Sequence, residues 1–290
     1  MSRRLLPLIL MLPLAALLAS GQLSPPPADV LPGAIGRGPS VVLVHGLGSR
    51  STLWLPLTRD LARDHRVVAA DLPGHGLSSM PSRLTLDLAA ASLERVIAAE
   101  PGPVVLVGHS VGGLVATLAA LRSPGRVRAL VLVETALAPA SSADERAGLR
   151  AALDRDFPGT VAAVYRSFGR DSVQGEMLAR EVLELDPAMV RAWIDVALDA
   201  DLSQAAAALT CPVLAVVAPH TWVTGETWED CARALGLSRI RDLQPLRVAH
   251  SGHFVLLDEP GVLAEAVRRL GRAEPGIPAV AMLAPGEGTR

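Results

Sequence analysis

Hydrophobic residues along the chain fall into short continuous runs, separated by stretches in which they recur with helical spacing. The apolar runs lie at residues 41–44, 67–70, 104–107, 130–133 and 212–218, with a weaker run at 246–249. Runs that are apolar at every position are typical of strands buried on both faces, as in a parallel sheet covered by helices. The pattern therefore predicts an α/β fold with a mostly parallel, doubly wound sheet.

Segments with helical spacing lie between these runs, at residues 53–63, 84–99, 111–122 and 258–270. The alternation stops between residues 136 and 210, where the pattern is helical and contains no convincing strand. Ser142-Ala143-Asp144-Glu145 has the form of a capping box there, and Asp186-Pro187 that of an N-cap followed by an N1 proline. We expect residues 136–210 to form a helical cap, inserted before the last two strands into a core of residues 41–135 and 211–271.

The two ends of the chain depart from this pattern. Residues 1–21 join a short basic start to an apolar segment with small residues at its end, as a secretory signal peptide does. The apolar segment contains two prolines and is shorter than the roughly 20 residues of a membrane span. We therefore expect a cleaved signal and a secreted or periplasmic protein without a stable membrane span; an uncleaved signal would anchor it. Residues 22–40 and 272–290 are rich in Pro and Gly and read as a linker and a tail.

Charge and cysteine content narrow the possible partners. The chain has 290 residues and a formal net charge of −2, which gives no reason to expect a nucleic-acid partner. Cys211 and Cys231 are its two cysteines, and neither belongs to a motif with metal-ligand spacing. We expect no metal and no other cofactor. The two cysteines form either one disulfide, if the protein is exported, or two buried thiols.

The sequence Gly108-His109-Ser110-Val111-Gly112 stands directly between an apolar run and a helical segment. A strand, a G-x-S-x-G motif and a helix in this order describe a nucleophile elbow, in which the serine is held on a strained turn. Ser110 is therefore the candidate nucleophile. The alternative is a glycine-rich turn that carries an incidental serine.

A candidate base lies near the other end of the chain, in Ser251-Gly252-His253-Phe254. This segment follows the last apolar run, so its loop lies at the sheet edge where such folds bind ligands. The small Ser251-Gly252 pair can present His253, which would take the proton of Ser110 and deliver it to the leaving group. We prefer it to His250, which reads as the last residue of the strand. His109 is expected to be a packing or hydrogen-bonding neighbour of the nucleophile.

These motifs, together with His45-Gly46-Leu47-Gly48 and the segment 71–78 (DLPGHGLS), resemble the α/β-hydrolase family in order and approximate spacing. The resemblance extends over residues 41–270. It implies a serine hydrolase with Ser110 as nucleophile and His253 as base. It also implies an oxyanion hole formed by the N–H groups of Leu47 and Val111. We interpret the segment 71–78 as structural support.

The acid of the triad is where the chain departs from the family pattern. In most members it follows the strand before the histidine strand, but residues 218–222 (APHTW) contain no carboxylate. Glu134 is the preferred candidate for the acid, because it directly follows a predicted strand and can orient the imidazole Nδ1–H. It also occupies a place that some members use for their acid. Glu226 and Asp230, on the loop of residues 221–230, are the alternatives, and the acid could also be absent.

The predicted activity is hydrolysis of a small or medium apolar carboxylic ester through an acyl-enzyme. Serine at the elbow argues against dehalogenase and epoxide hydrolase chemistry, which uses a carboxylate nucleophile. The aromatic residues of the cap (Phe157, Tyr165, Phe168 and Trp193) suggest an apolar pocket. Carbon–carbon bond hydrolysis or perhydrolysis could use the same serine. The alternative from another class is a weakly active or non-catalytic fold that binds an apolar ligand.

Overall fold

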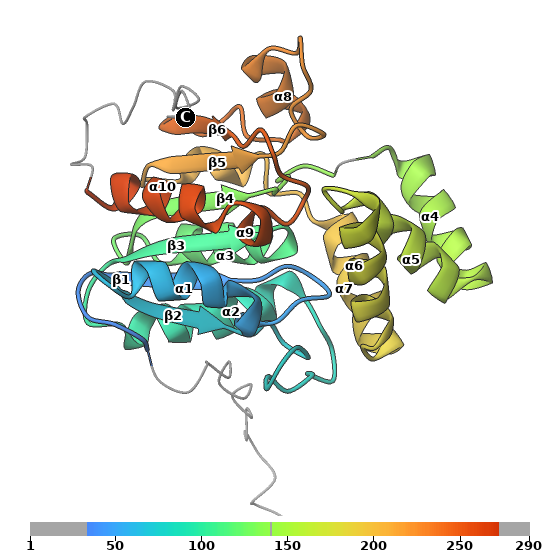
Figure 1. Ribbon diagram of the computed structural model, residues 1–290, viewed down its shortest axis with the longest axis horizontal. Helices are drawn as coiled ribbons and strands as arrows, with labels where there is room; N and C mark the ends of the chain where they lie inside the picture. The colour runs from blue at the N-terminus through green and yellow to red at the C-terminus, as the bar shows by residue number, and fades with distance from the viewer. Residues whose placement is uncertain (1–33, 140, 273–290) are drawn as a thin grey trace, which may run out of the picture.

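The computed structural model describes residues 34–139 and 141–272 (Figure 1). Its strands form one six-stranded sheet in the order β2-β1-β3-β4-β5-β6, and every neighbouring pair is parallel. The strands are β1 (Ser40–Val44), β2 (Arg66–Ala70), β3 (Val104–His109), β4 (Val127–Val133), β5 (Val213–Val217) and β6 (Leu243–Arg247). The predicted α/β fold with a parallel, doubly wound sheet is confirmed.

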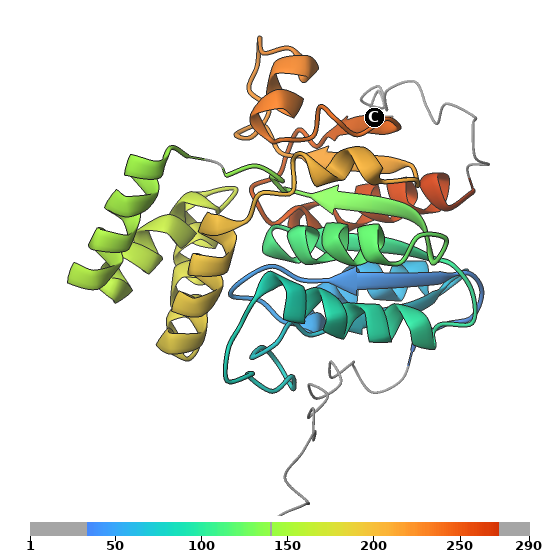
Figure 2. The same cartoon turned by 180° about the vertical axis from the view of Figure 1, so that it is seen from behind.

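Helices cover both faces of this sheet (Figures 1 and 2). One face carries α1 (Leu55–Leu61) and α10 (Pro260–Arg272), and the other carries α2 (Leu86–Ala99) and α3 (Val111–Arg122). The short helices η1 (Ser51–Trp54) and α9 (Val255–Asp258) precede α1 and α10. All residues of β1, β3 and β5 are buried, which explains why these strands are almost entirely apolar.

The last strand and one helix differ from the sequence prediction. The strand expected at residues 246–249 begins at Leu243 and ends at Arg247. It forms the edge of the sheet and pairs only with β5, so it tolerates Pro245 and polar residues that hide its pattern. A helix, α8 (Trp228–Ala234), lies at the β6 end of the sheet where a loop was expected (Figure 1). Thr227 caps it by accepting a hydrogen bond from the Asp230 N–H at 3.2 Å.

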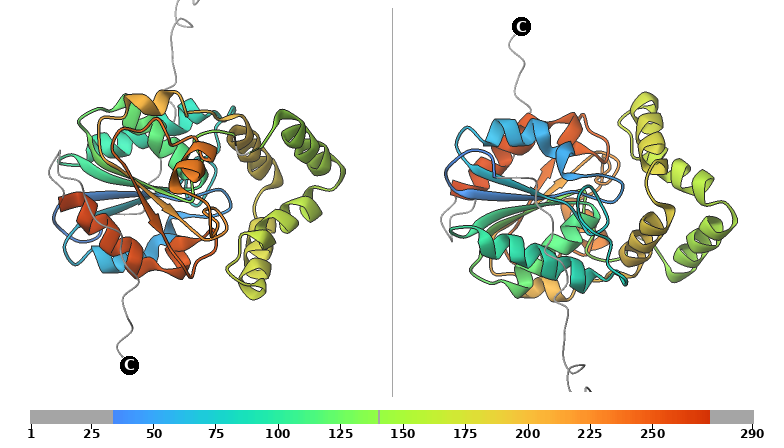
Figure 3. Two further views of the ribbon diagram at one scale, coloured as in Figure 1. Left: turned by 90° about the horizontal axis from the view of Figure 1, so that it is seen from above. Right: turned by 90° about the horizontal axis from the view of Figure 1, so that it is seen from below.

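Four helices between β4 and β5 form the cap, which lies beside the carboxyl ends of the strands (Figure 3). They are α4 (Ala143–Arg155), α5 (Phe157–Ser167), α6 (Ser172–Leu183) and α7 (Pro187–Asp199), followed by the short helix η2 (Ala205–Ala208). The capping box at Ser142 and the N-cap at Asp186 are both present. These two local signals therefore start α4 and α7 at the residues that the sequence indicates.

The cap is fixed to the core at the segment 71–78. Trp193 of α7 is fully buried, and its Nε1–H donates to the carbonyl oxygen of Pro73 at 2.9 Å. The Asp71 carboxylate holds this segment by accepting from the N–H groups of Ser51 at 2.6 Å and Leu77 at 3.2 Å. These contacts agree with the interpretation of the segment as structural support.

Both cysteines are buried free thiols in the structure. Burial raises the pKa of Cys211 and of Cys231 to about 11. The sequence left open one disulfide or two buried thiols, and the structure has two buried thiols. The predicted signal segment and nearly all of the predicted tail lie outside the described residues. Within residues 34–139 and 141–272, no helix has the length and apolar character that a membrane crossing requires.

Candidate active site

Ser110 stands on a strained turn between β3 and α3, with φ 53° and ψ −125°. A positive φ is unfavourable for a residue with a side chain, and the turn is held by close packing of its glycines. A Cβ on Gly108 would lie 2.6 Å from the carbonyl oxygen of Gly112, and one on Gly112 would lie 2.2 Å from that of His45. The local structure is that of a nucleophile elbow.

The register of the sheet places Glu134 beside this serine. His109 at the end of β3 pairs with Val133 at the end of β4, so the residues that follow them leave the sheet side by side. Glu134 has φ 49° and is, with Ser110, one of two non-glycine residues with positive φ in the described chain. Its N–H donates to the carbonyl oxygen of Val216 at 2.8 Å, which continues the ladder towards β5. Parallel strands thus bring both side chains to one edge.

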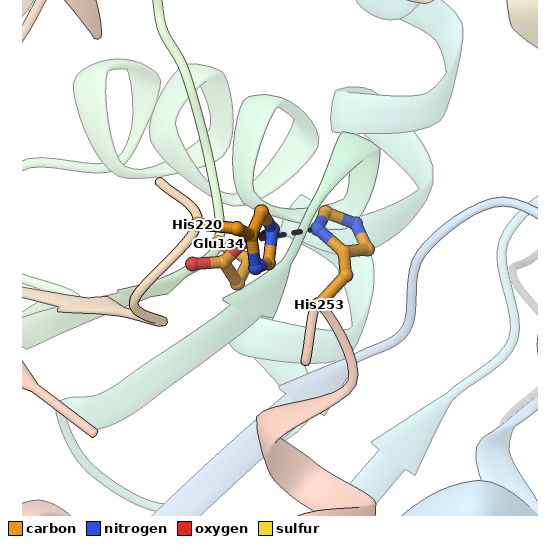
Figure 4. Close-up of side chains that lie close together, drawn as sticks. All are labelled: Glu134, His220 and His253. Carbon is orange, nitrogen blue, oxygen red and sulfur yellow. Dashed lines mark hydrogen bonds and ion pairs between the residues drawn. The ribbon is translucent and has the colours of Figure 1, made fainter. Parts of the chain in front are cut away.

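The Glu134 carboxylate is buried, with 1% of its side chain exposed, and four groups surround it. Oε1 accepts from the Ala218 N–H at 2.6 Å, and Oε2 accepts from the Thr221 hydroxyl at 2.8 Å. Two histidines lie beside the carboxylate (Figure 4): His253 Nδ1 is 3.1 Å from Oε2, and His220 Nε2 is 3.0 Å from it. Burial alone would raise the pKa of this carboxyl, but the hydrogen bonds from the two histidines hold it well below its usual value. Glu134 is therefore ionised and able to orient His253.

The two other candidate acids lie elsewhere. Asp230 accepts a hydrogen bond from the hydroxyl of Thr227, the N-cap of α8, and pairs with Arg233 at 2.7 Å. Glu226 closes a turn within its own loop. Among the contacts of the described residues, neither reaches His253. The structure thus brings Glu134 to the histidine, and not Glu226 or Asp230.

The His253 loop is held from both sides. On the cap side, the His253 N–H donates to the carbonyl oxygen of Phe168 at 2.9 Å. The two rings are stacked, with centroids 4.4 Å apart and planes at 22°. On the core side, the His253 carbonyl oxygen accepts from His109 Nε2 at 2.9 Å. Burial and the neighbouring His253 lower the pKa of His109 to about 3, so it stays neutral. His109 is thus a hydrogen-bonding neighbour, as predicted, whereas His250 lies in an exposed turn beyond β6 rather than in the strand.

The expected oxyanion donors lie beside the nucleophile. Leu47 and Val111 line the same cavity as Ser110. Throughout the described chain, neither N–H donates a hydrogen bond to another protein group, so both remain available. The Leu47 carbonyl oxygen accepts from the hydroxyl of Tyr165 at 2.9 Å, and this contact ties the loop to the cap. Two N–H groups beside a nucleophile can bind the oxyanion of a tetrahedral intermediate.

A cavity of about 310 Å³ lies between the core and the cap. The core supplies Ser110, Glu134 and His253, and the cap supplies mostly apolar side chains. A mostly apolar cavity with a few polar groups at one place is typical of small-ligand sites. Residues from the elbow, the β4 edge and the His253 loop therefore line one cavity.

A model of the alpha/beta hydrolase family matches residues 41–266 of the chain. This chain belongs to that family. The hydrolase is 35% identical over 270 residues to the polyketide synthase ThaQ of Burkholderia thailandensis, a match that covers 86% of this chain. The hydrolase spans only 13% of the length of that synthase.

Named esterases are also similar to the hydrolase. It is 28% identical over 260 residues to the pimeloyl-[acyl-carrier protein] methyl ester esterase of Xanthomonas axonopodis pv. citri, covering 83% of this chain and 98% of the relative. The solved structure of a thermophilic esterase from Thermogutta terrifontis aligns with a TM-score of 0.69 at 26% identity. That alignment covers 84% of this chain and 93% of the other.

His220 is a residue of this hydrolase site to which the sequence analysis gave no role. It follows β5, in the segment 218–222 that contains no carboxylate, and it binds Glu134 from the neighbouring strand. That hydrogen bond raises the pKa of His220. Ligand atoms of Glu134, His220 and His253 all lie within 4.8 Å of one another, so this group could hold a divalent metal ion. As arranged, the N–O distances of 3.0 and 3.1 Å are those of hydrogen bonds.

Asp258 is a second site residue that the sequence did not indicate. Its side chain is 1% exposed. On the core side it accepts from the Gly252 N–H at 2.9 Å. On the cap side it accepts from Gln174 Nε2 at 2.6 Å and pairs with Arg170 at 3.1 Å. One buried carboxylate therefore joins the His253 loop of the hydrolase to its cap.

Proposed function

We propose that this hydrolase cleaves carboxylic esters through an acyl-enzyme on Ser110, with His253 as base and Glu134 as acid. The observation that carries the proposal is the 3.1 Å hydrogen bond between His253 Nδ1 and Glu134 Oε2, at the sheet edge where Ser110 stands on its elbow. All three residues line one cavity. The named esterases among the relatives support ester cleavage.

The site residues have complementary roles in this reaction. His253 Nε2 takes the proton of the Ser110 hydroxyl as its oxygen attacks the ester carbonyl carbon. Glu134 holds the Nδ1–H and stabilises the imidazolium, while the N–H groups of Leu47 and Val111 bind the oxyanion. The imidazolium then gives its proton to the departing alcohol. Water, deprotonated by His253, hydrolyses the acyl-enzyme and regenerates the serine.

The substrate we propose is a small molecule with an apolar portion of small or medium size. The cavity of about 310 Å³ and its mostly apolar lining support this size and character. The alternative, a non-catalytic ligand-binding fold, rests on the absence of an acid from its usual place in the sequence. The hydrogen bond between Glu134 and His253 supports a catalytic site over this alternative.

Export of the protein is a further part of this proposal, supported by the signal-like residues 1–21. To test export, the full chain is expressed in its native host and the mass of the recovered protein is measured. Loss of about the first 21 residues is the expected result, and a full-length chain in the soluble cytoplasmic fraction would contradict it.

Labelling with a fluorophosphonate probe tests the proposed chemistry. We expect wild type to be labelled and Ser110→Ala to remain unlabelled, because the probe phosphonylates only an activated serine. A panel of p-nitrophenyl esters of increasing acyl length, with the same variant as control, then measures kcat/KM. Absence of labelling, or equal labelling of both proteins, would overturn the proposal.

A further inference from the structure

One basic side chain lines the mostly apolar cap side of the active-site cavity. Arg146 lines this cavity together with Leu149 and Leu153 of the same helix, α4. Residues spaced by three and seven positions lie on one face of a helix, so this face of α4 is turned towards the cavity. The α4 helix is part of the cap (Figure 1), whereas Ser110 lies between β3 and α3 of the core. The cavity thus extends from the nucleophile to an arginine of the cap.

Arg146 has no acidic partner among the described residues. Its guanidinium donates one hydrogen bond, to the carbonyl oxygen of Ser141 at 2.5 Å. Arg150, one turn further along α4, instead pairs with Asp195 at 3.0 Å and Asp199 at 2.7 Å. A guanidinium has five N–H donors in a planar fork that matches a carboxylate. Arg146 therefore keeps most of its donors and its charge available beside an apolar space.

We propose that Arg146 binds an anionic group, a carboxylate, at the end of the apolar chain of the ester substrate. This inference rests on the proposed ester hydrolysis and adds a substrate class to it. An anion is attracted to Arg146 and repelled by the ionised Glu134 at the nucleophile, so the two charges orient the substrate in one direction. The apolar lining holds the chain, and the ester carbonyl is left at Ser110.

Two pairs of ester series test which part of the substrate carries the carboxylate. In the first, monomethyl esters of straight-chain dicarboxylic acids are compared with methyl esters of monocarboxylic acids of equal length. In the second, ω-acetoxy carboxylates are compared with alkyl acetates. The readout is the ratio of kcat/KM for the charged over the neutral ester. Because the ratio is taken within each variant, a general loss of activity cancels.

We expect wild type to prefer the charged ester in one of the two series, by about 10-fold or more, as a charge-assisted hydrogen bond allows. Arg146→Gln should abolish this preference, and Arg146→Lys should retain part of it. Arg180→Gln is the matched control, since it removes a charge from an exposed position of the cap that does not line the cavity. Its preference should equal that of wild type.

Two results would overturn the inference while leaving ester hydrolysis intact. The first is that wild type hydrolyses the neutral esters and shows no preference for the charged ester in either series. The second is that a preference for the charged ester persists in Arg146→Gln. Binding gives a readout that does not need turnover: octanoate should raise the Tm of Ser110→Ala more than octanamide does. This difference should vanish in Ser110→Ala combined with Arg146→Gln. Equal shifts from both ligands would reject the Arg146 site even if no ester is cleaved.

Discussion

The hydroxyl of Tyr165 donates a hydrogen bond to the carbonyl oxygen of Leu47 at 2.9 Å, across the boundary between cap and core. Burial raises the pKa of the tyrosine, so the hydroxyl stays a neutral donor. Leu47 is one of the two residues whose N–H groups we place in the oxyanion hole. A cap side chain therefore fixes the loop to which we assign stabilisation of the transition state.

Tyr165→Phe removes this hydrogen bond and keeps the ring. We expect kcat for a p-nitrophenyl ester to fall roughly 3- to 10-fold with little change in KM, because a displaced oxyanion donor matters mainly in the transition state. The free energy of unfolding, from urea denaturation, should change by only about 1 kcal/mol. An unchanged kcat would show that the loop needs no support from the cap.

Asp258→Asn should weaken the connection between the cap and the His253 loop. The buried carboxylate loses its charge while Arg170 remains. We therefore expect the free energy of unfolding to decrease by about 1–3 kcal/mol and kcat to fall. Urea denaturation and ester kinetics measure the two effects. Glu176→Gln is the control, because it breaks an exposed pair with Arg166 and should change stability by at most about 1 kcal/mol. Equal effects of the two substitutions would contradict the role of Asp258.

Glu134→Gln tests the assignment of the acid. An amide can hold the imidazole in the wrong tautomer and cannot stabilise its charged form, so we expect kcat to fall by about 10³- to 10⁴-fold. Glu226→Gln and Asp230→Asn should keep kcat close to that of wild type, since neither contacts His253. If Glu134→Gln retains wild-type kcat, Glu134 is not the acid.

The two histidines bound to Glu134 should differ in importance. His253→Gln is expected to lower kcat by about 10³-fold or more, because it removes the base. His220→Gln should lower it less than about 10-fold, since the Ala218 N–H, the Thr221 hydroxyl and His253 still bind the carboxylate. Parallel ester kinetics of the two variants measure the difference. The reverse order would make His220 the base.

Buried neutral histidines should make the protein lose stability in mild acid. Burial lowers the pKa of His75 and of His109 to about 3, from an ordinary value of 6.5. At pH values between these two, the unfolded chain binds protons that the native state does not. The free energy of unfolding therefore decreases as the pH is lowered, by up to about 1.4 kcal/mol per pH unit for each group. The raised pKa of the half-buried His220 acts in the opposite direction and adds stability as pH falls.

Urea denaturation between pH 7.5 and 5 measures this slope. His75→Gln should flatten it, because one of the two imidazoles whose pKa is lowered by burial is gone. His250→Gln changes an exposed histidine and should leave the slope as in wild type. A slope that His75→Gln does not alter would mean that His75 does not contribute to it.

The sequence predicts best what depends on local pattern and burial. Strand β3 and the elbow are predictable because β3 is buried on both faces and the serine turn requires glycine on both sides. Strand β6 is misplaced in the prediction because an edge strand has no such burial and carries Pro245. The start of α8 was missed, although Thr227-Trp228-Glu229-Asp230 has the form of a helix N-terminus.

From the sequence, Glu134 could be ranked first among the candidate acids, but its contacts could not be assigned. Its meeting with His253 depends on the register of β3, β4 and β5 and on a loop 119 residues away in the chain. The role of His220 arises from a side chain that reaches across to the next strand, which no local pattern records. The contact of Phe168 with His253 depends on how the cap docks.

The attachment of the His253 loop to the cap matters for protein engineering. Replacing the cap helices, residues 143–199, with those of another hydrolase would remove the acceptor of the His253 N–H, the ring stacked on its imidazole and both cap partners of Asp258. Such a chimera would gain a new selectivity together with slower chemistry. Grafts that keep Phe168, Arg170 and Gln174 in place are the ones in which selectivity and rate can be changed independently.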